Sequence, residues 1–148
     1  MPGSLQQNNS PQNGHSARYG GEMMATGDGK RVWVFPDGDL PPAGDPDLPL
    51  EGHESLIVLN TGDEDADIEI DVYFSDREAE MGLKVSVPAG TVQCFRIDKP
   101  LGDRQFQVPF GQYALRLRSS APIVCQLGRA DVRQTNLSYY TTMGYCSD

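Results

Sequence analysis

The feature that most constrains the fold is a strict alternation of apolar and polar side chains over residues 66–74. An extended chain would place Ile68, Ile70, Val72 and Phe74 on one side and Glu69, Asp71 and Tyr73 on the other. Successive side chains of a β-strand point to opposite faces, whereas a helix needs apolar residues three or four apart. No long stretch of this chain shows the helical spacing. The alternation predicts a half-buried strand, whose acidic side faces solvent at a sheet edge and blocks unwanted strand pairing.

Other short segments rich in apolar residues follow one another along the chain, with turn signals between them. Pro36-Asp37-Gly38 is expected to end the first segment, and Ser120-Ala121-Pro122 to separate two later ones. We predict strands over residues 31–35, 54–60, 66–74, 83–87, 91–97, 112–119, 123–127 (extending to 131) and 137–145. Seven to eight strands predict an all-β domain, an antiparallel β-sandwich that is jelly-roll-like.

The chain divides into two parts by composition. Residues 1–29 are rich in Gln, Asn, Ser, Gly and Pro and predict a disordered N-terminal tail, because they cannot bury enough apolar surface. Residues 30–148 are expected to form a single domain. Within it, residues 39–52 hold four prolines and predict a long loop. Such a loop is either functional or a plain linker over a sheet edge.

Charge is unevenly spread. The formal net charge is −9, which disfavours a polyanionic partner for the chain as a whole. Residues 1–95 hold 17 acidic and 5 basic residues, whereas residues 96–133 hold 7 basic and 3 acidic ones. The asymmetry either serves contact between copies or only distributes solvated charge. A basic patch is conceivable around Arg116, Arg118, Arg129 and Arg133, so a DNA-contacting regulator is kept as an alternative, with nucleic acid as an unlikely partner.

Catalysis, metal binding and cofactor binding find little support. His53 is the one histidine in the segment expected to fold, and no G-x-S-x-G or H-E-x-x-H motif occurs. The acidic run that begins at Asp63 places Ile68 and Phe74 where a calcium-binding EF-hand loop needs Gly and Glu. The sequence predicts a protein that is not an enzyme and has no metal or cofactor.

The three cysteines are widely spaced and odd in number, which argues against disulfides and zinc. Cys94 and Cys125 lie in apolar stretches and are expected to be small buried residues. The cysteine usage, together with the lack of a signal pattern and of a membrane-spanning apolar run, predicts a cytoplasmic location.

A cluster of polar residues near the C-terminal end is the best candidate binding site. If one strand continues through residue 133, then Arg129, Asp131 and Arg133 project from one face, with Gln126 close by. Two guanidinium groups around a carboxylate suit sugar hydroxyls, carboxylates or a partner's charged side chains. The alternative is an internal salt-bridge ladder. Trp33 either stacks on a sugar ring or anchors the core.

Several short motifs, in the same order, resemble the sensory rhodopsin transducer family of the Anabaena type. They lie between about Lys30 and Tyr145: Trp33 before Pro36-Asp37-Gly38, Pro41-Pro42, His53-Glu54-Ser55 leading into residues 57–60, residues 62–66, residues 73–76, Val87-Pro88-Ala89, residues 122–124 with Gln126, and Arg129-x-Asp131-x-Arg133-Gln134. The sequence departs from the family around residues 98–110. Ligand specificity that depends on residues 98–110 therefore cannot be inferred for this chain from the family.

The resemblance implies a cytoplasmic β-sandwich that forms a homotetramer and is not an enzyme. It suggests small-molecule binding, with carbohydrates as suspected ligands, and signal transduction. The alternative partner is the cytoplasmic face of a sensory rhodopsin or another membrane receptor. The residues carried over as ligand-binding candidates are Trp33, Glu54, Asn60, Gln126, Arg129, Asp131 and Arg133.

Overall fold

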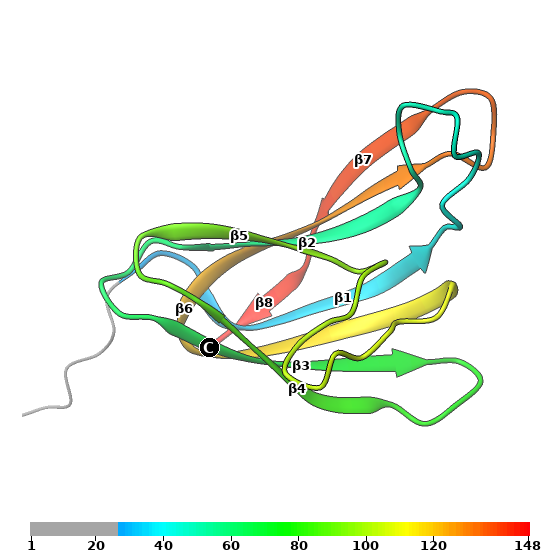
Figure 1. Ribbon diagram of the computed structural model, residues 1–148. Coiled ribbons are helices and arrows are strands. Elements are labelled where there is room, and N and C mark those ends of the chain that lie inside the picture. Colours follow the sequence, from blue (N-terminus) through cyan, green and yellow to red (C-terminus); the bar gives the residue numbers. More distant parts are fainter. Residues whose placement is uncertain (1–26) are drawn as a thin grey trace, which may run out of the picture.

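The computed structural model describes residues 27–148 and contains eight β-strands and no helix over that range (Figure 1). The predicted N-terminal tail therefore falls almost entirely outside the described residues. The strands are β1 (Lys30–Leu40), β2 (His53–Asn60), β3 (Ala66–Phe74), β4 (Glu80–Val87), β5 (Thr91–Arg96), β6 (Gly111–Asp131), β7 (Ser138–Met143) and β8 (Tyr145–Ser147).

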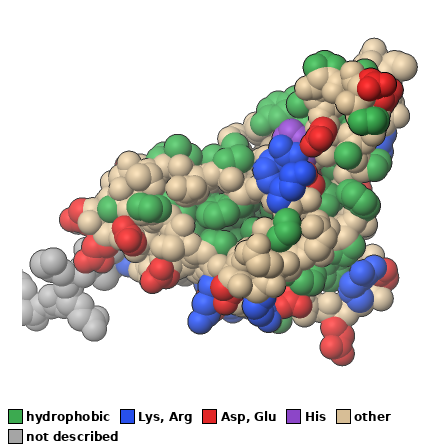
Figure 2. Space-filling view, viewed as in Figure 1, with side chains coloured by type: hydrophobic (Ala, Val, Ile, Leu, Met, Phe, Trp, Pro, Cys, Tyr) green, Lys and Arg blue, Asp and Glu red, His purple; other side chains and the backbone are tan. Residues whose placement is uncertain are grey.

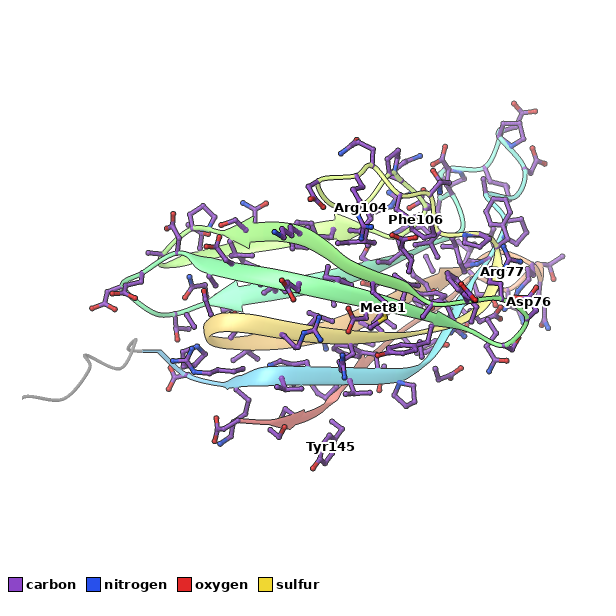
Figure 3. The ribbon with its side chains drawn as sticks, turned by 90° about the horizontal axis from the view of Figure 1, so that it is seen from below. Asp76, Arg77, Met81, Arg104, Phe106 and Tyr145 are labelled. Atoms are coloured by element: carbon purple, nitrogen blue, oxygen red, sulfur yellow. The ribbon has the colours of Figure 1, made fainter. Side chains whose placement is uncertain are left out.

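All strand pairs are antiparallel, and the strands form two layers that share β6. The first half of β6 belongs to a five-stranded sheet with the order β4-β3-β6-β1-β8, which faces the viewer in Figure 3. Its second half belongs to a four-stranded sheet with the order β5-β2-β6-β7. The prediction of an all-β antiparallel sandwich is confirmed.

The core lies between the two sheets and follows the alternation in the sequence. Ile68, Ile70 and Val72 of β3 are at most 1% exposed, and so are Leu56 and Val58 of the opposing sheet. Full burial of such a side chain contributes about 1.5–3 kcal/mol. The alternation therefore determines which face of each strand points inward.

Strand β1 is longer than predicted, because Pro36-Asp37-Gly38 does not end it. The pairing of β1 with β6 instead shifts register between Phe35 and Gly38, which absorbs these residues as a bulge. Gly38 is needed there, since a Cβ built on it would lie 2.4 Å from the Tyr113 Cζ atom.

The predicted break at Ser120-Ala121-Pro122 is also wrong, because β6 runs unbroken through 21 residues. No strand pair includes residues 120–122, which lie where the strand passes from one sheet to the other. Pro122 lacks an N–H, and at this crossing it has no ladder bond to lose.

Two further expectations need correction. Strand β3 is not an edge strand but lies between β4 and β6, and Asp71 on its outer side is 0% exposed because arginines of β6 cover it. Cys94 is exposed and not buried, since β5 is an edge strand and Cys94 lies outward beside Ile57. Cys125 is buried as predicted. Within residues 27–148, no helix is long and apolar enough to cross a membrane.

Candidate functional site

The centre of the candidate site is a buried ion pair between Glu54 of β2 and Arg129 of β6. The two residues are direct partners in the strand register, and both share the inward face with Leu56 and Leu127. Arg129 Nε donates a 2.7 Å hydrogen bond to Glu54 Oε1. Glu54 is 0% exposed and Arg129 8% exposed. Burial alone would lower the pKa of Arg129, but the bond to Glu54 and the charge of that carboxylate raise it.

Two more groups lie beside this ion pair, Asp39 of β1 and Tyr113 of β6. The Asp39 backbone N–H donates to Glu54 Oε1 at 3.2 Å. The Tyr113 hydroxyl lies near the Glu54 carboxylate, and burial, reinforced by that negative charge, raises the pKa of Tyr113. Neither Glu54 Oε2 nor Tyr113 Oη, both buried, makes a hydrogen bond of acceptable geometry with any described residue. The site therefore holds two buried oxygens that lie near each other, and neither makes a well-formed hydrogen bond.

Strand β7 supplies an aromatic wall. Tyr140 is the register partner of Arg129, whose Cζ atom lies 5.0 Å from the centre of the Tyr140 ring. That distance is typical of a cation–π contact. Arg129 Nη1 and Nη2 make no hydrogen bond within the described part of the chain. Glu54, Tyr113, Arg129 and Tyr140 are called the polar cluster below.

A cavity of about 480 Å³ adjoins the polar cluster between β1 and β7. Tyr140 and Asp37 belong to its wall, together with Tyr145, which projects from β8 away from the body of the domain in Figure 3. Thr141 and Thr142 add hydroxyl groups. The volume is within the range of small-molecule sites. Aromatic rings, hydroxyls and one carboxylate can contact a ring-shaped polar ligand from several sides.

Asp131 and Arg133 form a second group beside the polar cluster. Arg133 Nη2 lies 2.6 Å from Asp131 Oδ2 and 2.8 Å from Asp39 Oδ2. The hydrogen bond from Arg133 lowers the pKa of Asp131, and the hydrogen bond to Asp131 raises that of Arg133. A second cavity of about 600 Å³ opens between this pair and residues 134–138. Strand β6 ends at Asp131 and does not continue through residue 133, so the condition for the predicted Arg-Asp-Arg row is not met. Arg129 and Arg133 instead bind carboxylates of this chain.

The remaining predicted site residues lie elsewhere. Trp33 is 3% exposed, stacks on Phe35 in the core and donates through Nε1 to two backbone carbonyls. Asn60 is buried and holds the turn after β2 through bonds with residues 62, 64 and 87. Gln126 lies on the outer face of the four-stranded sheet, opposite to Arg129. The polar cluster therefore contains only Glu54 and Arg129 of the predicted set.

Sequence reasoning missed Tyr113, Tyr140 and Asp39. In the strand predicted over residues 112–119, Tyr113 alternates with Arg116 and Arg118 and shares a side with Leu115 and Leu117. A tyrosine hydroxyl on such an apolar side is a signal of a buried polar site. Nothing comparable marks Tyr140, which meets Arg129 only through the register of β6 with β7.

The arrangement suits binding. Within residues 27–148 no group of three or more His, Cys, Asp and Glu side chains could hold a metal ion. His53 Nδ1 bonds the Glu51 carbonyl at 2.8 Å, outside the polar cluster. The expected basic patch is neutralised, because Arg116 and Arg118 bind carboxylates of β3. This argues against nucleic acid as a partner.

Comparison with known proteins gives two kinds of result. The family model described as "Anabaena sensory rhodopsin transducer" matches residues 28–146. The crystal structure of Thermotoga maritima 1070 is 33% identical, with a TM-score of 0.70, over 81% of this chain and 97% of that one. The structure of the Anabaena sensory rhodopsin transducer is 34% identical, with a TM-score of 0.60, over 69% of this chain and 98% of that one. No curated protein matches the chain.

Proposed function

Because this chain belongs to the Anabaena sensory rhodopsin transducer family, we propose that it is a non-catalytic binding domain for a small polar molecule. The proposed ligand is a sugar or a similar polyhydroxyl compound. It contacts the polar cluster and occupies the adjoining cavity between β1 and β7. Asp131 and Arg133 border this region.

The observation that carries the proposal is a pair of neighbouring buried oxygens, Glu54 Oε2 and Tyr113 Oη, that make no well-formed hydrogen bond. A buried polar atom that makes no hydrogen bond costs about 1–3 kcal/mol. A ligand hydroxyl that donates to Glu54 Oε2 would recover this energy. The unbonded Nη1 and Nη2 atoms of Arg129 can donate to another oxygen of the same ligand.

The local charge favours a neutral ligand over an anion. The Glu54 carboxylate is bonded to Arg129, and the Asp37 carboxylate, which lies in the cavity wall, acts on Arg129 as a second negative charge. An anion would meet these carboxylates at close range, whereas hydroxyl groups can donate to them. The rings of Tyr140 and Tyr145 offer apolar surface for the faces of a sugar ring.

A thermal-shift screen of neutral sugars and small acids tests the proposal. At 100 times the dissociation constant a ligand adds about 2.7 kcal/mol to stability, which raises the melting temperature by several degrees. We expect a sugar to do so for the native sequence and for Glu69→Gln, a control at an exposed carboxylate on the opposite sheet. Glu54→Gln should lose the shift. Failure of every compound, or an undiminished shift in Glu54→Gln, would contradict the proposal.

A second candidate function is that of an adaptor that docks on the cytoplasmic face of a sensory rhodopsin or another membrane receptor. The name of the 34% identical relative supports it. The cytoplasmic location and the homotetramer expected from the sequence belong to this proposal as well. Co-purification with a candidate rhodopsin in detergent tests it, and a receptor that leaves the chain in the unbound fraction would contradict it.

A further inference from the structure

The segment between β5 and β6, residues 97–110, covers the side of the sandwich that lies between the edge strands β4 and β5 (Figure 1). Three of its apolar residues are at most 2% exposed and belong to the core: Ile97, Leu101 and Val108. The Asp103 N–H donates to the Lys84 carbonyl at 3.0 Å, and the Lys84 N–H donates to Asp103 Oδ1 at 2.9 Å. These core contacts and hydrogen bonds hold the segment against β4.

A cavity of about 420 Å³ lies between this segment and the strands β4 and β5, and we call it the β4–β5 cavity. The apolar part of its wall consists of Val85, Phe95, Pro100 and Leu101. Figure 2, which views this side of the domain, shows hydrophobic side chains between the two layers and acidic and basic ones along the lower edge, near β3 and β4. The volume is within the range of small-molecule sites, and the apolar wall suits the body of a small organic ligand.

Three basic side chains line the same cavity: Lys84, Arg96 and Lys99. Arg96 and Lys99 share the carboxylate of Asp98, with Arg96 Nε 2.7 Å from Oδ1 and Lys99 Nζ 3.2 Å from Oδ2. Burial alone would raise the pKa of Asp98, but the hydrogen bonds from these two cations lower it. Glu51 approaches Arg96 only to 3.8 Å and is 60% exposed, so water screens much of its charge. The two cations therefore have one close counter-ion between them.

The third cation, Lys84, has no counter-ion. Its Nζ atom makes no hydrogen bond or ion pair with any described residue. Its register partner on β3, Glu69, binds Arg118 at 3.0 Å instead. The Asp103 carboxylate, on the other side, accepts from the Lys84 backbone. This ammonium group in the cavity wall is therefore available to an anionic group of a ligand, and hydrogen bonds between ionised groups are the strong ones.

We propose that the β4–β5 cavity binds a small carboxylic acid with an apolar body, such as an aromatic or a branched-chain acid. Its carboxylate contacts the ammonium groups of Lys84 and Lys99, and its apolar part lies against the Phe95 ring. The small excess of positive charge favours one carboxylate over ligands with several negative charges. The further charges of a nucleotide or a sugar bisphosphate would meet Asp98 and Asp103.

This site is separate from the polar cluster. Figure 3 places Arg104 and Phe106 of the covering segment at one edge of the domain, and Tyr145, in the wall of the cavity between β1 and β7, at the opposite edge. Within the described part of the chain, no residue lines both cavities. The covering segment is also where the sequence departs from its family, so the site is expected to be particular to this chain. The sugar-induced thermal shift depends on Glu54 and binding of the acid on Lys84, so each proposal can fail without the other.

Ligand-detected NMR titration of the full chain tests the proposal, with benzoate and 3-methylbutanoate as probes. Benzamide, a neutral analogue of benzoate with nearly the same shape, is the control ligand. We expect at least one of the two acids to bind with a dissociation constant of about 1 mM or below. Benzamide should bind about tenfold more weakly or not at all, because it lacks the charge that Lys84 and Lys99 recognise.

Two charge-neutralising variants form a matched pair. Lys84→Gln should weaken binding of the acid about fivefold or more, and it should leave the fold intact because the Lys84 side chain makes no bond within the described residues. Lys30→Gln changes the net charge equally, at an exposed side chain of β1 that lines neither cavity. It should bind the acid as the native chain does. Equal weakening in both variants would mean that the net charge of the chain, and not this cavity, attracts the acid.

Cys94, an exposed thiol in the wall of the β4–β5 cavity, reports where the probe binds. In a Cys146→Ser background, the acid should slow the reaction of Cys94 with the uncharged reagent 2,2′-dithiodipyridine, whereas Cys125 is buried and should not react. Any of three further outcomes would overturn the proposal: neither acid binds, benzamide binds as tightly as benzoate, or a saturating acid leaves the reaction rate of Cys94 unchanged.

Discussion

Two buried carboxylates, Asp71 and Glu54, each bind arginine side chains of β6, yet their surroundings differ. Both carboxylates are 0% exposed. Asp71 Oδ1 accepts from the Gly82 N–H at 2.9 Å and from Arg118 at 3.1 Å, and Oδ2 accepts from Arg116 at 2.9 Å. Glu54 Oε1 has two donors, but Oε2 has none.

The difference is that every oxygen of Asp71 has a donor, whereas one oxygen of Glu54 has none. Both carboxylate oxygens of Asp71 accept hydrogen bonds from within the chain, so Asp71 has a structural role: it holds β3, β4 and β6 together. Glu54 retains an acceptor that the folded chain does not use, beside an arginine with unbonded terminal nitrogens. A buried polar atom of this kind calls for an explanation. The binding function proposed above provides one.

The largest effect should follow Asp71→Ala. The change leaves Arg116 and Arg118 without their shared acceptor and leaves the Gly82 N–H unpaired. Breaking a buried ion pair costs about 3–5 kcal/mol. Urea unfolding measures the loss, and Glu69→Ala, at the exposed pair with Arg118, should cost at most about 1 kcal/mol. Equal losses in both variants would mean that the saturation of Asp71 has no energetic value.

A smaller loss is expected for Gly38→Ala, which acts on the polar cluster through sterics. The new methyl group would lie 2.4 Å from Tyr113 Cζ, so the ring or the β1 bulge must move. Overpacking of this kind costs about 1–3 kcal/mol. The melting temperature reports it. In a Tyr113→Leu background the penalty should shrink, and an unchanged penalty would place the strain elsewhere.

Tyr113→Phe is expected to be neutral or to stabilise the ligand-free domain by up to about 1 kcal/mol, because it removes an unpaired buried hydroxyl. The same variant should weaken the sugar-induced thermal shift. If stability falls by more than about 1 kcal/mol, then the hydroxyl bonds Glu54 directly in solution. In that case Glu54, like Asp71, has all its hydrogen bonds within the chain, and no oxygen remains to accept one from a ligand.

The smallest effect concerns Asp131, a partly exposed carboxylate. Because the hydrogen bond from Arg133 lowers its pKa in the folded state, its contribution is present above the unfolded value of about 3.9 and is lost as pH falls through the folded pKa. Arg133→Gln should therefore destabilise the domain slightly near pH 7, and the difference from the native chain should shrink below about pH 4. Urea unfolding across this range measures it. If the difference in unfolding free energy between the two proteins did not change with pH, the effect of Arg133 would not come from its ion pair with Asp131.

The sequence predicted local structure well and long-range pairing poorly. The alternation over residues 66–74 placed β3 at its observed bounds, because period two is a local property of the chain. The continuity of β6 and the bulge at Gly38 depend on neighbours distant in sequence, and both were misread as turns. The charge asymmetry had the same cause. Acidic residues of β2 and β3 pair with arginines of β6 within one chain, an outcome that the sequence could not distinguish from contact between copies.

The candidate site was recovered in part for the same reason. Glu54 and Arg129 were both candidates from motifs, but their adjacency required the register of β2 with β6. Trp33 and Asn60, also suggested by motifs, have their polar atoms bonded to backbone groups. Motifs thus supplied candidate residues, and only strand pairing shows which of the candidates lie together.

The 21 residues of β6 have a mechanical consequence. A single extended backbone belongs to both layers, so one layer cannot slide over the other without tearing ladder bonds in each. Force applied to β6 at Arg129 would be transmitted along its extended backbone to Arg116 and Arg118 in the other sheet. The two layers should therefore unfold together in one cooperative transition.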